Sequence, residues 1–143
     1  MKSHITVLID SSTQDIHTEL KRMLEPHRLN EDDADSIRKH HWDYWFFPSE
    51  NRFDDGELKA RFRGTDPEIL VHSSYVRNLP GDYSTSGIIL LDGSWIDLQD
   101  FGWRLMNEPS AKNRSAWEKW LKKLELFLDE NREQICTQVI LHC

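Results

Sequence analysis

The stretch that decides the fold is Gly87-Ile88-Ile89-Leu90-Leu91-Asp92-Gly93-Ser94-Trp95-Ile96-Asp97-Leu98. Two runs rich in β-forming residues flank the dipeptide Asp92-Gly93, which is typical of a two-residue type I′ turn. This pattern predicts a β-hairpin. Because side chains alternate along a strand, Trp95 and Asp97 are expected on one side of the second strand and Ile96 on the other.

Apolar blocks near both ends of the chain predict two further strands, from His4 to Ile9 and from Ile135 to Leu141. Between the first strand and the hairpin, apolar residues recur at helical spacing and predict a helix. Ser12 and Asp15 resemble a capping box at its start, and Pro26 ends it.

A second helix is predicted from Asn30, because acidic residues fill the first turn that would follow it. A longer helix begins near Ser110, where one face becomes apolar and the other carries lysines. Its apolar stripe consists of Ala116, Trp117, Trp120, Leu121, Leu124, Phe127 and Leu128. Burial is predicted in particular for Trp117, Leu121, Leu124 and Leu128. Its polar face predicts solvation of Lys119, Lys122 and Lys123.

The centre of the chain is less regular. Residues 48–68 contain scattered proline and glycine and are interpreted as a strand and a loop, while Ile69 to Val71 suggest another strand segment. No repeat or linker divides the chain. The sequence therefore predicts a single α+β domain of residues 1–143, in which two or three helices pack on an antiparallel or mixed sheet.

Charge limits the possible partners. The formal net charge is −7, and acidic runs at residues 31–35 and 54–57 are interpreted as a solvated acidic face. Mimicry of nucleic acid towards a basic partner is the alternative explanation of these runs. Direct binding of nucleic acid is not expected, because the phosphate backbone would be repelled. Apolar runs are too short to span a bilayer and no signal-peptide core is present, so a cytoplasmic protein without membrane contact is expected.

Tryptophan and its aromatic neighbours are concentrated in one segment, because residues 40–47 read His-His-Trp-Asp-Tyr-Trp-Phe-Phe. Such rings either pack in a core or form a binding surface, where large rigid rings serve as interface anchors. The candidate binding residues are Trp42, Tyr44, Trp95 and Trp103, with Trp95 the first choice of anchor.

The order of these phrases resembles a group of small bacteriophage and bacterial proteins without an assigned function. The matching phrases are Trp42-Asp43-Tyr44-Trp45, Asp92-Gly93-Ser94-Trp95, Gly102-Trp103 and the ending Leu141-His142-Cys143. The chain departs from the group at residues 49–53, where a double glycine is replaced. The resemblance implies a phage or mobile-element setting and implies no activity.

Catalytic and metal-binding patterns are sparse. Asp43 between two aromatic rings suggests a general base whose pKa is raised by an apolar setting, acting with His41 and Arg52. A structural carboxylate that caps a turn or pairs with Arg52 or Arg61 is the simpler explanation. His40, His41, His142 and Cys143 contain zinc-ligand atoms, but adjacent histidines point to different sides, so neither a metal nor a cofactor is predicted.

The two cysteines, Cys136 and Cys143, lie seven residues apart, which is about 23 Å along a strand. A disulfide between them is therefore not expected, and Cys136 is predicted to be buried.

These observations favour an accessory protein of phage or mobile-element type that binds a protein partner, one with a basic surface, and modulates it stoichiometrically. The sequence specifies no oligomeric state. The alternative is a small hydrolase or transferase that uses Asp43, His41 and Arg52. A close triangle of these three side chains would favour the enzyme, whereas a flat surface bearing Trp95 or Trp103 would favour binding.

Overall fold

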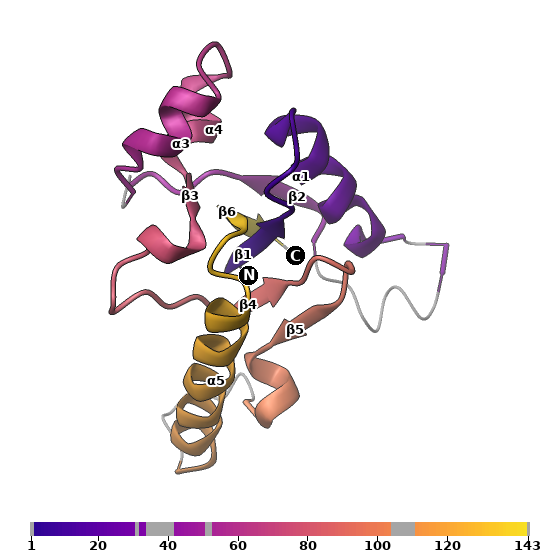
Figure 1. Ribbon diagram of the computed structural model, residues 1–143. Helices are drawn as coiled ribbons and strands as arrows, with labels where there is room; N and C mark the ends of the chain where they lie inside the picture. Colours follow the sequence, from indigo (N-terminus) through magenta and orange to yellow (C-terminus); the bar gives the residue numbers. More distant parts are fainter. Residues whose placement is uncertain (1, 31, 34–41, 51–52, 104–110, 143) are drawn as a thin grey trace.

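The computed structural model describes residues 2–30, 32–33, 42–50, 53–103 and 111–142, and it confirms an α+β fold built on one mixed sheet (Figure 1). The strands are β1 (Lys2–Ile9), β2 (Tyr44–Phe46), β3 (Ser73–Tyr75), β4 (Gly87–Ile89), β5 (Trp95–Asp97) and β6 (Ile135–His142). Their order across the sheet is β2-β6-β1-β4-β5, and β3 pairs with β6 beside β2.

The two longest strands form the centre of the sheet. β1 and β6 pair antiparallel over their full lengths, from Lys2 opposite His142 to Ile9 opposite Ile135. β4 runs parallel to β1, whereas β2, β3 and β5 are antiparallel to their neighbours. Both ends of the described chain therefore meet in adjacent central strands.

The α-helices in the described residues are α1 (Ile16–Leu24), α3 (Gly56–Arg61), α4 (Pro67–Val71) and α5 (Ala111–Glu130). Short 3-10 helices are η1 (Glu25–His27), η2 (Val76–Asn78) and η3 (Leu98–Phe101). The expected helix α1 is confirmed, but its cap is Asp15 rather than Ser12, because the Asp15 carboxylate accepts the Thr18 backbone N–H at 3.1 Å. The helix predicted from Asn30 falls largely outside the described residues.

The prediction of a strand and a loop at 48–68 and a strand at Ile69 to Val71 was wrong, because α3 lies within the first range and α4 includes Ile69 to Val71. Each helix begins at an aspartate whose side chain accepts a backbone N–H, Asp55 for α3 and Asp66 for α4. Pro67 adds a pre-set backbone angle at the start of α4. These helices are too short to show an apolar period in the sequence. Their N-terminal capping aspartates are the sequence signals that indicate them.

The hairpin is confirmed, but its turn is not type I′. Gly93 has φ +89°, and no other residue type in the described chain has positive φ, so Asp92 cannot supply the second positive angle. The Gly93 N–H donates to Leu90 at 2.8 Å, and the Leu90 N–H donates to Ser94 at 2.9 Å. This arrangement is a three-residue connection that ends in a glycine bulge.

The sheet has an apolar core on each face. One core joins the β1 residues Ile5, Val7 and Ile9 to side chains of α1, α3 and α4. The other joins Leu8 of β1 to side chains of α5. Figure 1 accordingly shows α1 and α5 on different sides of the sheet.

Helix α5 buries one side of its predicted apolar stripe more deeply than the other. Its fully buried apolar side chains are Ala116, Trp120, Leu124 and Phe127. Four residues of the predicted stripe are buried, and the other three, Trp117, Leu121 and Leu128, are half-buried. The lysines Lys119, Lys122 and Lys123 are exposed as expected. The apolar arc is wider than one contact surface, so half of it covers the sheet and half lies beside it.

Within the described part of the chain, no helix combines the length and the apolar character needed to cross a membrane.

Leu124 and Leu126 allow a matched test of this helix orientation, because Leu124 is 1% exposed and Leu126 is 53% exposed. Leu124→Ala is expected to lower the free energy of unfolding by about 2–5 kcal/mol through a cavity in the core. Leu126→Ala should change it by less than about 0.5 kcal/mol. Chemical denaturation measures both, and equal losses would contradict the orientation.

Candidate functional site

The aromatic segment around β2 lies against the end of β6. The Asp43 backbone N–H donates to the His142 carbonyl at 2.7 Å, and the Asp43 carboxylate lies 2.8 Å from His142 Nδ1. The Tyr44 ring stacks on the His142 ring, with centroids 4.4 Å apart and planes 15° from parallel. The fold thus joins two segments that are 99 residues apart in the sequence.

The alternative interpretation of Asp43 as a general base with a raised pKa was wrong. The hydrogen bond from His142 lowers the pKa of Asp43 below its usual value, and the Tyr44 backbone N–H adds to this effect. An ionised carboxylate only accepts hydrogen bonds, so His142 Nδ1 must carry the shared hydrogen. When the imidazole is neutral, its Nε2 is therefore a proton acceptor.

A pocket of about 360 Å³ opens beside the β2 edge of the sheet. We call it the edge pocket; its lining residues are Lys21, Leu24, Glu25, Arg28, Trp42, Asp43, Tyr44 and Trp45. Trp42 is only 5% exposed, and its indole N–H donates to the Leu24 carbonyl at 2.9 Å. Tyr44 is 50% exposed. Of these two candidate binding residues, Trp42 is therefore buried in the wall of the pocket, whereas the Tyr44 side chain is exposed.

Some charged side chains around the edge pocket form ion pairs and others do not. Arg28 lies over the Trp42 ring at 5.6 Å and 3.7 Å from Glu25, while Asp43 is engaged by His142. Lys21 is exposed and forms no ion pair with any residue in the described ranges. The pocket is thus lined by two cations and by the two carboxylates of Glu25 and Asp43.

The other two candidate anchors, Trp95 and Trp103, are half-buried and pack on opposite cores. The Trp95 indole N–H donates to Asp97 at 2.9 Å, which confirms that these two side chains share a side of β5. The Trp95 ring also meets the His27 ring at 5.3 Å. Trp95 and Trp103 thus help to pack the hairpin and η3, and neither is a largely exposed ring.

Two members of the proposed catalytic triangle, His41 and Arg52, lie outside the described residues, as do His40 and Cys143. Arg61, considered as a partner of Asp43, instead donates to the Tyr75 hydroxyl at 3.0 Å. Among the residues that the structure describes, no three His, Cys, Asp or Glu side chains form a group that could hold a metal ion.

Cys136 is buried, as predicted. Burial raises the pKa of the Cys136 thiol to about 12, so the thiol stays protonated and unreactive at neutral pH.

A larger groove of about 680 Å³ runs between α5 and the segment from η2 to β4. We call it the α5 groove. The α5 wall is formed by Trp117, Leu121, Leu124 and Leu128, and the opposite wall by Leu79, Pro80 and Tyr83. The half-buried part of the α5 arc thus faces this groove, where its apolar side chains are accessible.

The rim of the α5 groove is acidic. Asp82 and Glu125 line it and form no ion pair within the described residues. Arg132 also lines it, but Asp129 binds its guanidinium at 2.7 Å. The unpaired charges at the rim are therefore carboxylates.

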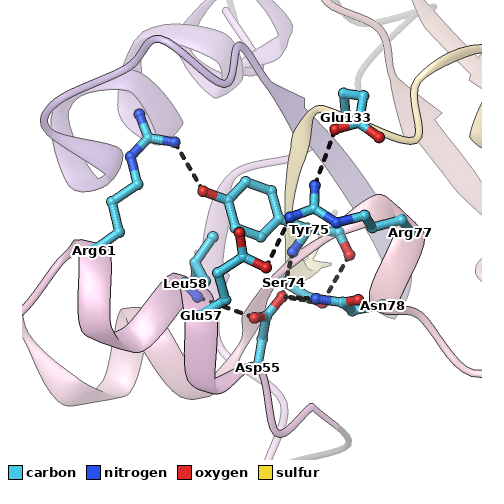
Figure 2. Close-up of polar contacts among 9 residues, drawn as sticks. All are labelled: Asp55, Glu57, Leu58, Arg61, Ser74, Tyr75, Arg77, Asn78 and Glu133. Atoms are coloured by element: carbon cyan, nitrogen blue, oxygen red, sulfur yellow. Dashed lines mark hydrogen bonds and ion pairs between the residues drawn. The ribbon is translucent and has the colours of Figure 1, made fainter.

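Arg77, the remaining cation of the groove, is held from two sides. Figure 2 shows its guanidinium between Glu57, at 2.9 Å, and Glu133, at 3.2 Å. These ion pairs join α3, η2 and the turn before β6. Arg77 is thereby kept in a structural role at one end of the groove.

Beneath Arg77, the buried carboxylate of Asp55 ties α3 to β3 and η2 (Figure 2). It accepts hydrogen bonds from the Leu58 and Tyr75 backbone N–H groups, the Ser74 hydroxyl and the Asn78 amide, at distances of 2.8–3.1 Å. Burial by itself would raise the pKa of Asp55, but these four hydrogen bonds outweigh it and lower the pKa. The expectation that residues 54–57 form a wholly solvated acidic face was therefore wrong.

Sequence reasoning missed several site residues. Lys21 and Arg28 show no motif, because they belong to an ordinary amphipathic helix and the turn after it. His142 was considered only as a metal ligand. Trp117 and Leu121 were assigned to the core. The apolar arc of α5 is wider than the surface that the sheet can cover, and this width was the one signal that some of its residues lie outside the core.

Comparison with family models, with curated proteins and with solved structures finds no match to this chain.

The Asp55 carboxylate should make stability depend on pH. Its pKa is lower in the folded state than the usual value of about 3.9, so its contribution is complete above that value and is lost as the pH falls through the folded pKa. Asp55→Asn is expected to lower the unfolding free energy by about 1.5–3 kcal/mol at neutral pH. The difference in unfolding free energy between this variant and wild type should become smaller at acidic pH.

Asp54→Asn is the matched control, because the Asp54 side chain is 96% exposed and, among the described residues, pairs with Lys59 alone, at 3.3 Å. Denaturation curves at several pH values measure both variants. A loss for Asp55→Asn that stays constant down to acidic pH would contradict the role assigned to its charge.

Proposed function

We propose that this protein acts by stoichiometric association with a protein partner, and that the α5 groove receives a basic amphipathic helix of that partner. One observation carries the proposal: half-buried apolar side chains of α5 line a groove whose unpaired rim charges are acidic. The phage or mobile-element setting implied by the sequence resemblance fits an accessory protein that modulates its partner.

The dimensions of the α5 groove suit a helix. The lining residues Trp117, Leu121, Leu124 and Leu128 recur at helical spacing over about 17 Å, or three helical turns. A partner helix buries its apolar stripe in such a groove through side chains at similar spacing.

Charge selects among helical partners. Asp82 and Glu125 are available to lysine or arginine on the partner, and the net charge of −7 would attract a basic segment from a distance. An acidic helix would meet repulsion from the same carboxylates. Association should weaken as salt is added, since charges are screened over about 8 Å at physiological ionic strength.

Co-purification from the native host, followed by mass spectrometry, should recover a partner with a basic amphipathic segment. A synthetic peptide of that segment should bind in calorimetry. Trp117→Ala is expected to weaken binding by at least about 2 kcal/mol, or about 30-fold, because a large ring in the groove is lost. Glu125→Lys should weaken it through repulsion.

Leu126→Ala and Glu118→Lys are the controls, because both residues are exposed on α5 and neither lines the groove. Their binding should stay within about twofold of wild type. The groove assignment fails if Trp117→Ala binds the peptide as wild type does, and the basic-helix assignment fails if Glu125→Lys binds it more tightly.

The second candidate function is a small hydrolase or transferase, and the contact between Asp43 and His142 favours it. Asp43 at 2.8 Å orients the imidazole, so that Nε2 is placed to accept a proton from water or substrate. In this hypothesis His142 has the role that the sequence analysis assigned to His41. Both side chains are on the surface, with 44% of Asp43 and 31% of His142 exposed.

Asp43→Asn tests this second candidate, because an amide in place of the carboxylate removes the charge that orients His142. If the protein is an enzyme, this change should abolish turnover in a screen of small ester and phosphoester substrates while leaving the fold intact by circular dichroism. Turnover by wild type that Asp43→Asn leaves unchanged would rule out the pair as its source.

A further inference from the structure

We propose that Tyr83 is the positioning residue that fixes the width of the α5 groove. Its hydroxyl donates to Thr6, which in turn bonds Thr85, and α5 is attached to the same buried group through Trp120. Both walls of the groove are thereby held to one point in the core. The effect of Tyr83 on binding rests on the proposed association, whereas its effect on the groove is a property of the free protein.

The wall opposite α5 consists of residues 79–84, which we call the wall segment. The Leu79 N–H donates to the Val76 carbonyl and the Tyr83 N–H to the Pro80 carbonyl, each at 3.1 Å. These bonds close turns within the connection from η2 to β4. They shape the wall segment, but they do not set its distance from α5, so a side-chain contact with the core is needed to set that distance.

Tyr83 supplies this contact. Its hydroxyl bonds the Thr6 hydroxyl of β1, and its ring meets the Phe53 ring with centroids 5.7 Å apart. Thr6 is fully buried and Phe53 is 4% exposed, so both partners belong to the close-packed interior. The half-buried Tyr83 thus links a surface turn to a central strand of the sheet.

The donors in this network can be assigned, because each hydroxyl group carries one hydrogen. The Thr85 hydroxyl donates to the Gly87 carbonyl at 3.0 Å, since a carbonyl only accepts. The Thr6 hydroxyl must then donate to Thr85, at 2.9 Å, which leaves Tyr83 as the donor to Thr6. We call this series from Tyr83 through Thr6 and Thr85 to Gly87 the hydroxyl relay. It begins at the hydroxyl hydrogen of Tyr83.

Helix α5 is attached to the hydroxyl relay from the other side. The Trp120 indole N–H donates to the Thr85 carbonyl at 2.6 Å, and both residues are buried. The separation of the two walls is therefore set inside the core, and the α5 groove is formed before a partner arrives. A preformed groove binds a helix without the entropic cost of ordering its wall.

Hydrogen exchange of backbone amides, followed by NMR on the full chain, measures the relay without any partner. Tyr83→Phe keeps the ring and removes the donor, so the amide of residue 83, which closes the turn onto Pro80, should exchange at least about fivefold faster. Tyr75→Phe is the matched control. It also removes a hydroxyl that is hydrogen-bonded, to Arg61 at 3.0 Å, but Tyr75 does not line the groove. Exchange at residue 83 should then stay within about twofold of wild type.

Thr6→Val and Thr6→Ser test whether Thr6 transmits the contact. Thr6→Val removes the acceptor and should speed exchange at residue 83 as Tyr83→Phe does, whereas Thr6→Ser keeps a hydroxyl and should not. Combining Tyr83→Phe with Thr6→Val should add less than about twofold to either change alone, because both break the same relay. Independent structural roles would instead give effects that multiply. Circular dichroism and thermal unfolding confirm that each variant is folded.

The binding probe is a synthetic amphipathic helix of about 18 leucine and lysine residues, titrated by calorimetry. Wild type should bind it, and Tyr83→Phe should bind at least about threefold more weakly, because the wall segment must then be ordered on binding. Tyr75→Phe should bind as wild type does.

The proposal is overturned if Tyr83→Phe leaves exchange at residue 83 unchanged, or if Tyr83→Phe binds the peptide as tightly as wild type does. It is also overturned if Thr6→Ser speeds exchange as much as Thr6→Val, because the hydroxyl would then not be the group that matters. Failure of wild type to bind the peptide would count against the proposed association, while the exchange rates would still decide the role of Tyr83.

Discussion

The antiparallel pairing of β1 with β6 is the interaction on which the rest of the structure depends. It holds the two ends of the described chain together over eight residues of each strand, and β6 also pairs with β2 and β3. Side chains alternate along β6, so Val139 enters the core beneath α1 while Cys136 enters the core beneath α5. Loss of this pairing would remove the common wall of both cores.

Both candidate sites are consequences of this central pairing. The edge pocket exists because β2 adds to the outer side of β6, which brings Asp43 and Tyr44 to His142. The α5 groove exists because α5 covers the other core with only part of its apolar arc, leaving Trp117 and Leu121 half-buried. Each site thus lies where an element packed on the central strands extends beyond them.

The two sites differ in the charged side chains that line them, which the net charge of the chain does not reveal. The chain as a whole is acidic, yet among the described residues Lys21 of the edge pocket forms no ion pair, and neither do Asp82 and Glu125 of the α5 groove. Because screening limits exposed charges to about 8 Å, each site is governed by its own neighbours. The basic partner segment proposed for the α5 groove is therefore matched to the carboxylates of that groove rather than to the net charge of the chain.

The sequence by itself determined the α+β class, both central strands, helices α1 and α5, the hairpin and the burial of Cys136, because each depends on a local period, a turn or a long apolar face. It also singled out Trp42 and Tyr44 through their aromatic density. Only the tertiary structure decided that α3 and α4 are helices, since short helices depend on caps such as Asp55 that are completed by distant partners. It alone placed His142 beside Asp43 and Trp117 at a groove, because contacts between segments far apart in the chain leave no periodic signal in either segment.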